Sequence, residues 1–499
     1  MTGQKSEQAT ESQGFSDQVK GAVLWRSGSQ MAGQLVTWAA TFMVVRLLTP
    51  SDYGLVAMCD VVFTFLGLMS GWGFASGLIR SESVTREQIR QVFGLLILTN
   101  FGLALVQFAV APIAASYFHQ PMIADLLRVQ ASLYLIMPFI ALPQNLLARR
   151  LDFKRQGQVN LVAAFVSAAT ALACAMAGWG PWTLIAAPAA LWVARAIGFS
   201  VAAKLWMLPS FRFAGTAKLV SFGGAMVAVQ FLWFAQSQAD VFIAGRVLPA
   251  HELGLYTTAL FLTQIVAAKF VPPLNEVAFA AYAKIQSERE TMRWAFLKSI
   301  RLIMLVAMPF YCGLVVTAEP LVHVLLGPQW LESAPLVSIL ALAMPLLTLQ
   351  ILFAPATNAI GRLNVSVRTG AAGAILLPLA FLVGINWGVE GLAWAWLGGT
   401  AALLAVTILL SLPVIGVSGS QLLAAVSPGW LSSAGMAFLV AGLDSLLPPL
   451  GQGARLAVLA PFGMASYAAL LFLFARPIVE EVVSLLRPNR GQRTATQTL

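Results

Sequence analysis

The segment Arg46-Leu-Leu-Thr-Pro-Ser-Asp-Tyr-Gly-Leu55 has a related copy 200 residues later in the same chain. The second copy is Arg246-Val-Leu-Pro-Ala-His-Glu-Leu-Gly-Leu255. In each copy a long apolar run ends at the arginine, a short polar turn follows, and a second apolar run begins. This pattern predicts a transmembrane helical hairpin that is used once in each half of the chain, as in two-lobed transporters built from internal repeats.

A second pair of matching segments supports the repeat. Asn145-Leu-Leu-Ala-Arg149 and Asn358-Ala-Ile-Gly-Arg362 each close an apolar run, and they lie 213 residues apart. If both lobes begin on the same side of the membrane, the repeats are parallel and are related by an axis along the membrane normal. The expected division of the chain is a polar tail over 1–20, an N-lobe over 21–206, a C-lobe over 207–413, additional helices over 414–475 and a polar tail over 476–499.

The composition indicates an integral membrane protein. Of the 499 residues, 59% are hydrophobic and 10% are charged, whereas a soluble domain carries about 25% charged residues. The net charge of +10 is explained by Lys and Arg retained on cytoplasmic loops, so no nucleic-acid partner is expected. The three cysteines lie within apolar runs and lack the spacing of a metal site or a disulfide framework.

Apolar runs of about 20 residues predict an all-α polytopic membrane protein with about fourteen transmembrane helices. The fold class we expect is two pseudo-symmetric six-helix bundles followed by two C-terminal helices. Prolines inside the spans, such as Pro138 and the Pro272-Pro273 pair, are expected to kink them. The expected spans are 22–45, 52–79, 91–117, 123–148, 157–179, 182–206, 216–244, 252–282, 296–318, 332–360, 364–385, 390–413, 428–447 and 454–475.

The distribution of positive charge predicts the orientation in the membrane. Connections after the even-numbered spans up to the tenth contain most of the Lys and Arg residues, including a basic connection over 283–295. The opposite connections contain only Arg46, Arg128, Arg246 and Arg455. By the positive-inside rule both termini are therefore expected to be cytoplasmic. The basic segment 284–298 is amphipathic and is suited to contact with anionic membrane lipids.

The first expected helix carries a polar stripe. Arg26, Gln30, Gln34, Thr37 and Thr41 recur at steps of three or four residues, so they share one helical face. Two interpretations are open, namely packing against a neighbouring helix and lining of a water-filled cavity. We favour the cavity, because such a stripe does not face lipid.

The seventh expected helix has a related but weaker stripe, formed by Gln230, Ser237 and Asp240 with Trp233 on the same side. The first and seventh helices occupy matching positions in the two lobes. The repeat therefore predicts that one such helix from each lobe faces a central cavity.

Two cations are expected near the middle of the bilayer, one in each lobe. Arg195 lies in the sixth span, and Lys269 lies in the eighth, with Glu276 on the same face further along. Cations at this depth suit an anionic substrate such as a phosphate, which arginine binds as a fork and lysine as a point charge. For Lys269 an ion pair with Asp240, Asp60 or Glu276 is an equally good interpretation.

Asp60 and Asp240 lie in the outer parts of the second and seventh spans. They could couple transport to a cation or neutralise Arg46 and Arg246, and we favour neutralisation because an unpaired buried carboxylate is costly. Arg46 and Arg246 are expected at the outer mouth, where they would cap helix ends and snorkel to the interface. We find no metal-ligand cluster, no cofactor motif and no nucleophile–base pair, so no metal, no cofactor and no catalytic residue is expected.

Several of these segments resemble one known family. Val45-Arg-Leu-Leu-Thr-Pro-Ser-Asp-Tyr-Gly54, Asp240-Val-Phe-Ile-Ala-Gly-Arg246, Leu253-Gly-Leu-Tyr256 and Leu326-Gly-Pro-Gln-Trp330, together with Trp25, look like the polysaccharide transporter family. This family contains Wzx-like flippases of the multidrug/oligosaccharidyl-lipid/polysaccharide exporter superfamily. The resemblance covers about residues 18–415.

The resemblance implies alternating access by two six-helix bundles in the bacterial cytoplasmic membrane. It also implies transfer of undecaprenyl-diphosphate-linked oligosaccharides to the outer leaflet, with a polysaccharide polymerase and export machinery as partners. We expect Arg26, Arg195 and Lys269 to line the cationic cavity, although no family motif marks them. The alternatives are a cation-coupled multidrug exporter, which would need acidic residues at the midplane, and a membrane polymerase or ligase, which would need a large outer loop.

Overall fold

The computed structural model describes residues 28–70, 85–150, 152–205, 207–212, 217–476 and 480, with the backbone alone over 217–229. Within these residues all regular structure is helical, which confirms the predicted all-α class. Packing divides the chain into two compact units, residues 1–257 and 258–499, and the division falls inside α10 (Ala250–Ile265). The lobe boundaries inferred from the repeat stay a prediction.

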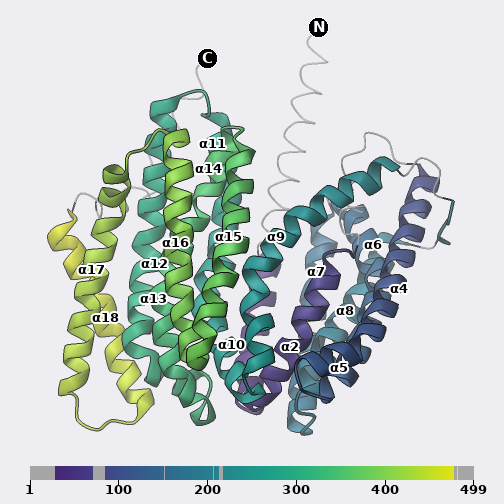
Figure 1. The fold of residues 1–499 in the computed structure, drawn as a ribbon, viewed down its shortest axis with the longest axis horizontal. Coiled ribbons are helices and arrows are strands. Elements are labelled where there is room, and N and C mark those ends of the chain that lie inside the picture. Colours follow the sequence, from purple (N-terminus) through teal and green to yellow (C-terminus); the bar gives the residue numbers. More distant parts are fainter. Residues whose placement is uncertain are drawn as a thin grey trace, which may run out of the picture. The chain divides into compact units, whose positions relative to one another are not determined.

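The first unit begins with a helix over residues 28–45 and ends in the first turns of α10. Successive spans alternate in direction (Figure 1). Its other helices are α2 (Pro50–Gly67), α4 (Arg86–Tyr117), α5 (Met122–Ile136), α6 (Pro138–Arg149), α7 (Phe153–Met176), α8 (Trp182–Ala203) and α9 (Ala217–Val247).

The second unit continues from α10 through a π-helical turn, η1 (Val266–Phe270), into α11 (Val271–Lys284). Its remaining elements are α12 (Arg289–Leu325), the 3-10 turn η2 (Pro328–Ser333), α13 (Ala334–Ile351), α14 (Phe353–Ala359), α15 (Leu363–Gly384), the 3-10 turn η3 (Ile385–Trp387), α16 (Gly388–Ile415), α17 (Gly419–Leu446) and α18 (Gln452–Phe474).

The sequence sets the start of α2 through a capping box in the first repeat segment. The Thr49 side chain accepts a hydrogen bond from the Asp52 backbone N–H, and the Asp52 carboxylate accepts one from the Thr49 backbone N–H at 2.8 Å. Pro50 occupies the first helical position, where its missing N–H costs nothing. The polar turn of the repeat is therefore the signal that ends one span and starts the next.

Two of the predicted proline kinks are present. The expected span 123–148 is interrupted at Met137, and α6 starts at Pro138. Proline has no backbone N–H, so it cannot donate the helical hydrogen bond to the preceding turn. The expected span 252–282 contains η1 directly before Pro272 and Pro273 at the start of α11. Isolated π-helical turns of this kind are frequent at functional sites.

Several expected boundaries were wrong. α12 begins at Arg289 rather than near 296, so the predicted connection over 283–295 shrinks to the four residues between Lys284 and Arg289. α17 begins at Gly419 rather than near 428. The reason is that an apolar run marks only the part of a helix inside the bilayer, whereas helical hydrogen bonding continues through polar turns such as the one in which Arg293 pairs with Glu290 at 2.7 Å.

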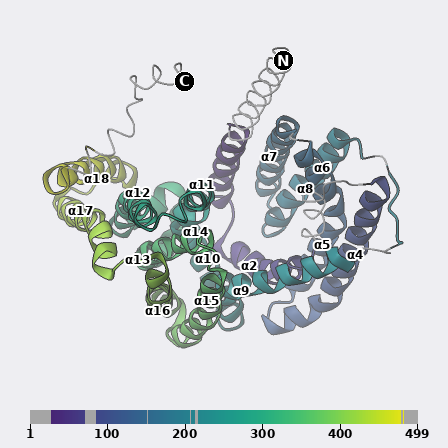
Figure 2. The same cartoon turned by 90° about the horizontal axis from the view of Figure 1, so that it is seen from above.

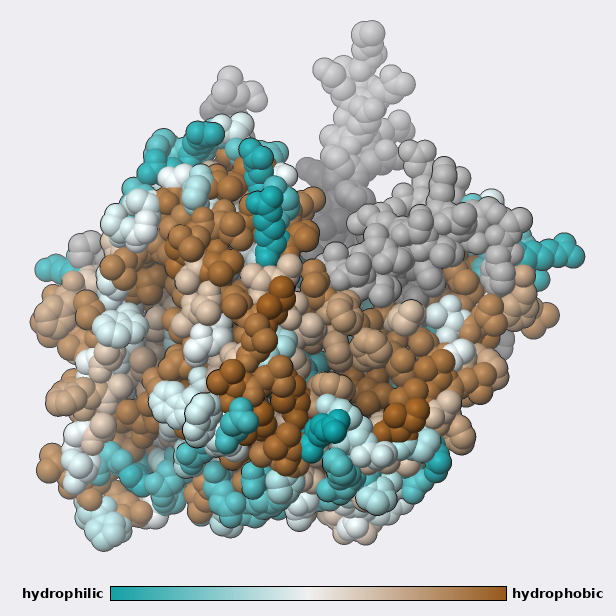
Figure 3. All heavy atoms as spheres, viewed as in Figure 1, coloured by the Kyte–Doolittle hydropathy of each residue, from teal (hydrophilic) through white to brown (hydrophobic). Residues whose placement is uncertain are grey.

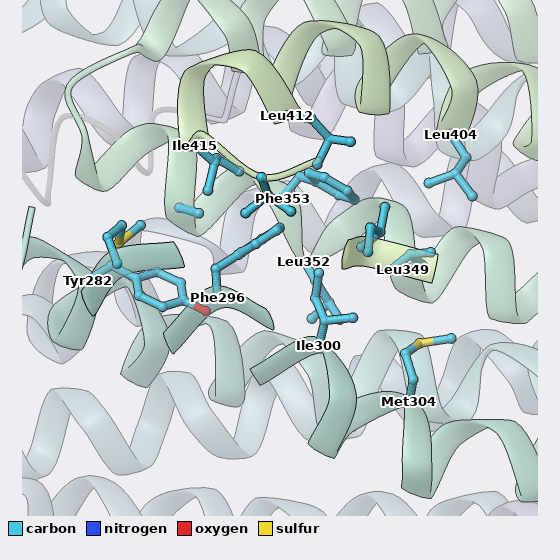
Figure 4. Close-up of a cluster of buried hydrophobic side chains, with 14 of the residues drawn as sticks. Tyr282, Phe296, Ile300, Met304, Leu349, Leu352, Phe353, Leu404, Leu412 and Ile415 are labelled. Atoms are coloured by element: carbon cyan, nitrogen blue, oxygen red, sulfur yellow. The ribbon is translucent and has the colours of Figure 1, made fainter. Parts of the chain in front are cut away.

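A cluster of large apolar side chains forms the core of the second unit (Figure 4). Phe296 of α12 and Phe353 of α14 lie in its centre, and their ring centroids are 5.3 Å apart. Leu349, Leu412 and Ile415 close the cluster from α13 and α16. Burial of this surface fixes α12 against the broken helix α13–α14.

The last two helices are part of the second unit. α17 and α18 pack against each other and against α12 (Figure 2). The Tyr467 hydroxyl of α18 donates a hydrogen bond to the Leu305 carbonyl at 2.6 Å. At the end of the hairpin, Arg455 binds both oxygens of Asp444 at 2.6 and 2.5 Å. This fork-to-carboxylate geometry holds the α17–α18 turn closed.

The described residues contain ten helical segments that are long and apolar enough to cross a membrane. Hydrophobic residues cover the middle of the helices, and hydrophilic residues gather toward their ends (Figure 3). These features confirm a multi-pass membrane protein. The count of fourteen spans stays a prediction.

Candidate functional site

The sixth span places one cation inside the first unit. Arg195 lies in α8, between Trp192 and the fully buried Phe199. The Trp192 ring contacts the Phe63 ring of α2, and their centroids are 5.6 Å apart. The Arg195 side chain is half-buried, and its Nε is buried without a hydrogen-bond partner. No described carboxylate lies within ion-pairing distance of it. A cation in this state can receive an anion without first losing a protein partner.

Asp60 is an acidic side chain of the same unit that is exposed. It lies in α2, and its Oδ1 accepts a hydrogen bond from Nε2 of Gln130 in α5 at 2.8 Å. Gln130 is 5% exposed, and its own Oε1 is buried without a partner. No described Lys or Arg pairs with Asp60. Asp60 is therefore held by a hydrogen bond from an uncharged amide, and the ion pair with Arg46 that the sequence favoured is not present.

Asp60 and Arg195 lie at different depths. α2 and α8 run in the same direction, and the contact between Phe63 and Trp192 sets their register. Asp60 precedes Phe63 by three residues and Arg195 follows Trp192 by three, so the two charges are about 9 Å apart along the helix axes at the 1.5 Å rise of an α-helix. They are too far apart in depth to neutralise each other by direct contact.

The second unit contains the other predicted midplane cation. Lys269 lies in the π-helical turn η1, and its side chain is exposed. Glu276 of α11 is also exposed, and no ion pair joins it to Lys269. Within the described part of this unit, the ammonium group thus has no carboxylate partner.

The polar stripe of the first helix divides into two kinds of residue. The hydroxyls of Thr37 and Thr41 donate to the carbonyls of Gly33 and Thr37, each at 2.8 Å, so they satisfy themselves within the helix. Gln30 is exposed and Gln34 is half-buried. Arg26 lies outside the described residues. The two glutamines are the members of the described stripe with amides available to a solute.

The stripe of α9 ends in a buried group. Gln230 is exposed, and the half-buried Ser237 hydroxyl donates to the Phe234 carbonyl at 3.5 Å. Asp240 is fully buried and accepts a hydrogen bond from the Tyr256 hydroxyl at 2.6 Å. The backbone N–H of the next residue, Val241, also donates a hydrogen bond to the Asp240 carboxylate at 2.8 Å. These bonds satisfy the carboxylate in the interior, and its role in neutralising Arg246 or in coupling to a cation stays a prediction.

The two repeat arginines are exposed, and their position at an outer mouth stays a prediction. The Arg246 guanidinium lies over the Tyr117 ring at 5.0 Å, and this ring stacks on Phe242 at 4.9 Å. Tyr117, Gln130 and Tyr256 were not predicted as site residues. Each of them lies close to other polar residues in the sequence, so no signal in the sequence set them apart.

The described residues contain no group of three or more His, Cys, Asp or Glu side chains that could hold a metal ion. The functional groups found in the spans are single charges and amides. Such an arrangement can bind and orient a charged solute.

Comparison with known proteins gives matches in sequence and in fold. The profile of the family described as "Polysaccharide biosynthesis protein" matches residues 43–335, more than half of the chain. The succinoglycan biosynthesis transport protein ExoT of Rhizobium meliloti (strain 1021) is 25% identical over 320 residues, which are 64% of this chain and 65% of ExoT. The teichuronic acid biosynthesis protein TuaB of Bacillus subtilis (strain 168) is 23% identical over 95% of this chain and 98% of its own length.

Two solved structures have a related fold. The lipid II flippase MurJ in an inward closed conformation matches with a TM-score of 0.76 at 12% identity and covers 92% of this chain and 100% of its own. An inward-facing multidrug resistance MATE family transporter matches with a TM-score of 0.57 at 16% identity and covers 79% of this chain and 98% of its own. The predicted MATE-like fold is therefore confirmed.

Proposed function

Because the chain belongs to the polysaccharide biosynthesis protein family, we propose that it translocates undecaprenyl-diphosphate-linked oligosaccharide units across the bacterial cytoplasmic membrane. The expected class, a transporter and not an enzyme, agrees with the flippase and exporter folds that the chain shares. The glycan units would serve exopolysaccharide, capsule or O-antigen synthesis. A polymerase and export machinery would receive them on the outer side.

The observation that carries this proposal is the unpaired guanidinium of Arg195. A fixed cation inside a span costs roughly 2.5–3.5 kcal/mol on insertion scales, and no described carboxylate offsets this cost. A diphosphate would offset it by accepting a fork of charge-assisted hydrogen bonds. Lys269 would add a second, point-like positive charge, and Gln30 and Gln34 would contact hydroxyl groups of the sugars.

In this mechanism the polyprenyl chain stays in lipid while the diphosphate binds Arg195. Positive charge in the connections after the even-numbered spans supports cytoplasmic termini and loading from the cytoplasmic leaflet. Alternating access would then expose the diphosphate to the outer side.

The substitution Arg195→Ala tests the proposal. A hydrogen bond to a charged group contributes about 1.5–3 kcal/mol, so we expect glycan export to fall by about ten- to a hundredfold. Lipid-linked units should accumulate on the cytoplasmic leaflet, and protein abundance should not fall, because no protein partner is lost. Arg195→Lys should restore only part of the export, since the planar fork is absent.

The exposed Arg362, which precedes α15, provides the matched control. Arg362→Ala removes the same charge outside the span and should export normally. Normal export by Arg195→Ala at normal abundance would refute the anionic-substrate mechanism. The alternative, a cation-coupled multidrug exporter, is favoured by one observation, the exposed carboxylate of Asp60, and it predicts instead that Asp60→Asn abolishes transport of cationic drugs.

A further inference from the structure

An apolar trough of about 760 Å³ lies along the hairpin of α15 and α16 in the second unit. The two helices run side by side through the height of the unit (Figure 1). Leu379 and Val383 line the trough from α15, and Trp387, Glu390, Trp394 and Gly398 line it from the turn and from α16. None of these residues contributes to the proposed translocation site.

Glycines bring the two helices together beneath the trough. A Cβ atom on Gly384 would overlap the carbonyl of Gly391, and one on Gly391 would overlap the carbonyl of Gly384. The backbones therefore touch at this point, and the larger side chains beside them form the walls. At Gly398 a Cβ atom would meet nothing within 4 Å, so the trough remains open at its deep end.

The length and direction of the trough match one leaflet of a bilayer. It begins at the turn η3, which lies between the spans expected over 364–385 and 390–413, and it runs along α16 to Gly398. Eleven helical residues from Trp387 to Gly398 correspond to about 16 Å. Half of a hydrocarbon core of roughly 30 Å is about the same. An acyl chain that enters from the surface would fill the trough.

The polar chemistry is concentrated at the surface end. Trp387 is 71% exposed and Trp394 is 50% exposed, and Glu390 lies between them on the same face of α16. Glu390 is exposed and pairs with no described cation. Tryptophan faces attract ammonium groups, and a carboxylate accepts hydrogen bonds from a primary ammonium but not from a quaternary one.

A tryptophan belt and a helix dipole account for part of this pattern. Exposed tryptophans are common at membrane interfaces, and an acidic residue is favourable in the first turn of a helix. Neither effect explains why a trough with glycines at its base continues from Trp387, Glu390 and Trp394 toward the middle of the span. A ligand with an ammonium head and an apolar chain explains both ends together.

We propose that the α15–α16 trough binds a phospholipid with a primary ammonium headgroup. The headgroup lies between Trp387 and Trp394 with its ammonium on Glu390, and one acyl chain lies along Leu379 and Val383 to Gly398. The carboxylate repels anionic headgroups, so phosphatidylethanolamine is preferred to phosphatidylglycerol. Phosphatidylcholine retains the contact with the tryptophans but loses the hydrogen bonds to Glu390.

The test measures lipid retention by the purified full-length protein with native mass spectrometry, after exchange into detergent with phosphatidylethanolamine, phosphatidylcholine or phosphatidylglycerol. We expect phosphatidylethanolamine to be retained at least tenfold more than phosphatidylglycerol. Gly398→Phe fills the trough and should remove this preference. Gly442→Phe is the matched control, because Gly442 of α17 is also free of neighbours within 4 Å.

Two further variants separate the headgroup from the chain. Glu390→Gln keeps the shape of the side chain and should make phosphatidylethanolamine and phosphatidylcholine bind equally. Trp430→Ala, which removes another exposed tryptophan of the second unit, should leave the preference unchanged. The proposal is overturned if wild-type protein retains the three lipids equally, if Gly398→Phe keeps the preference, or if Trp430→Ala abolishes it as well. None of these outcomes depends on glycan transport.

Discussion

Gly54 and Gly254 meet in a reciprocal contact between the first turns of α2 and α10. A Cβ atom on Gly54 would overlap the carbonyl of Ala250, and one on Gly254 would overlap the carbonyl of Pro50. The repeat offset relates Pro50 to Ala250 and Gly54 to Gly254, so the two copies of the repeat segment pack against each other with approximate two-fold symmetry. Only glycine allows two backbones to approach this closely.

This contact predicts that alanine is not tolerated at either glycine. Gly54→Ala and Gly254→Ala should each lower the free energy of unfolding by about 1–3 kcal/mol, because overpacking forces the backbones apart. Thermal unfolding of the purified protein in detergent measures the effect. Gly102→Ala in α4 is the control, since its Cβ atom would meet nothing within 4 Å. If Gly54→Ala proves as stable as Gly102→Ala, the close contact does not form.

The bond between Asp60 and Gln130 predicts a coupled pair. Gln130→Leu removes the amide that donates to the carboxylate and should destabilise the protein by about 1–3 kcal/mol. Asp60→Asn should lower the free energy of unfolding by less, because a neutral amide does not need a hydrogen-bond donor as a carboxylate does. In a double-mutant cycle the two changes should be non-additive by at least about 0.5 kcal/mol. Additive costs would show that the two side chains act independently.

Substitution of Lys269 is expected to reduce transport without reducing the abundance of the protein. Because no described carboxylate pairs with it, Lys269→Ala should leave abundance unchanged and reduce glycan export, and Lys269→Arg should be tolerated. Lys284→Ala, at the other end of the α11 segment, is the matched control and should export normally. A fall in abundance of Lys269→Ala that is rescued by Glu276→Gln would instead establish the ion-pair interpretation.

The proposed orientation is tested by single cysteines at Ser51 and Ser287. Ser51 lies in the first turn of α2, and Ser287 lies in the exposed connection between α11 and α12. In a background without Cys59, Cys174 and Cys312, an impermeant reagent applied to intact cells should label Ser51→Cys and not Ser287→Cys. The opposite result would reverse the assignment of both termini to the cytoplasm.

The family resemblance inferred from the residues is confirmed. It could be recognised because the segments that carry it are short and contiguous in the sequence. The segment around Arg46 combines a span end, a capping threonine, a proline at the first helical position and a span start within ten residues. Such a segment specifies its own conformation, so its type can be recognised without knowledge of the rest of the fold. The proline breaks at Pro138 and before Pro272 were predictable for the same reason.

The site residues were only partly predictable. The sequence identified Arg195, Asp60 and Lys269 because a charge inside an apolar run is conspicuous. It gave no information on whether each charge has a partner. Gln130 lies 70 residues from Asp60 along the chain, and their hydrogen bond exists only because α5 packs against α2.

The membrane class, the all-helical structure and the family follow from the residues alone, because hydrophobic length and capping chemistry act within one span or one turn. Which charges have partners depends on the packing of the helices. This packing buried Asp240 beneath Tyr256, left Arg195 without a described carboxylate, and joined the two repeat segments at Gly54 and Gly254. Electrostatic partners and backbone contacts depend on distances of a few ångströms between remote segments, and these distances are fixed only by the packing of whole helices.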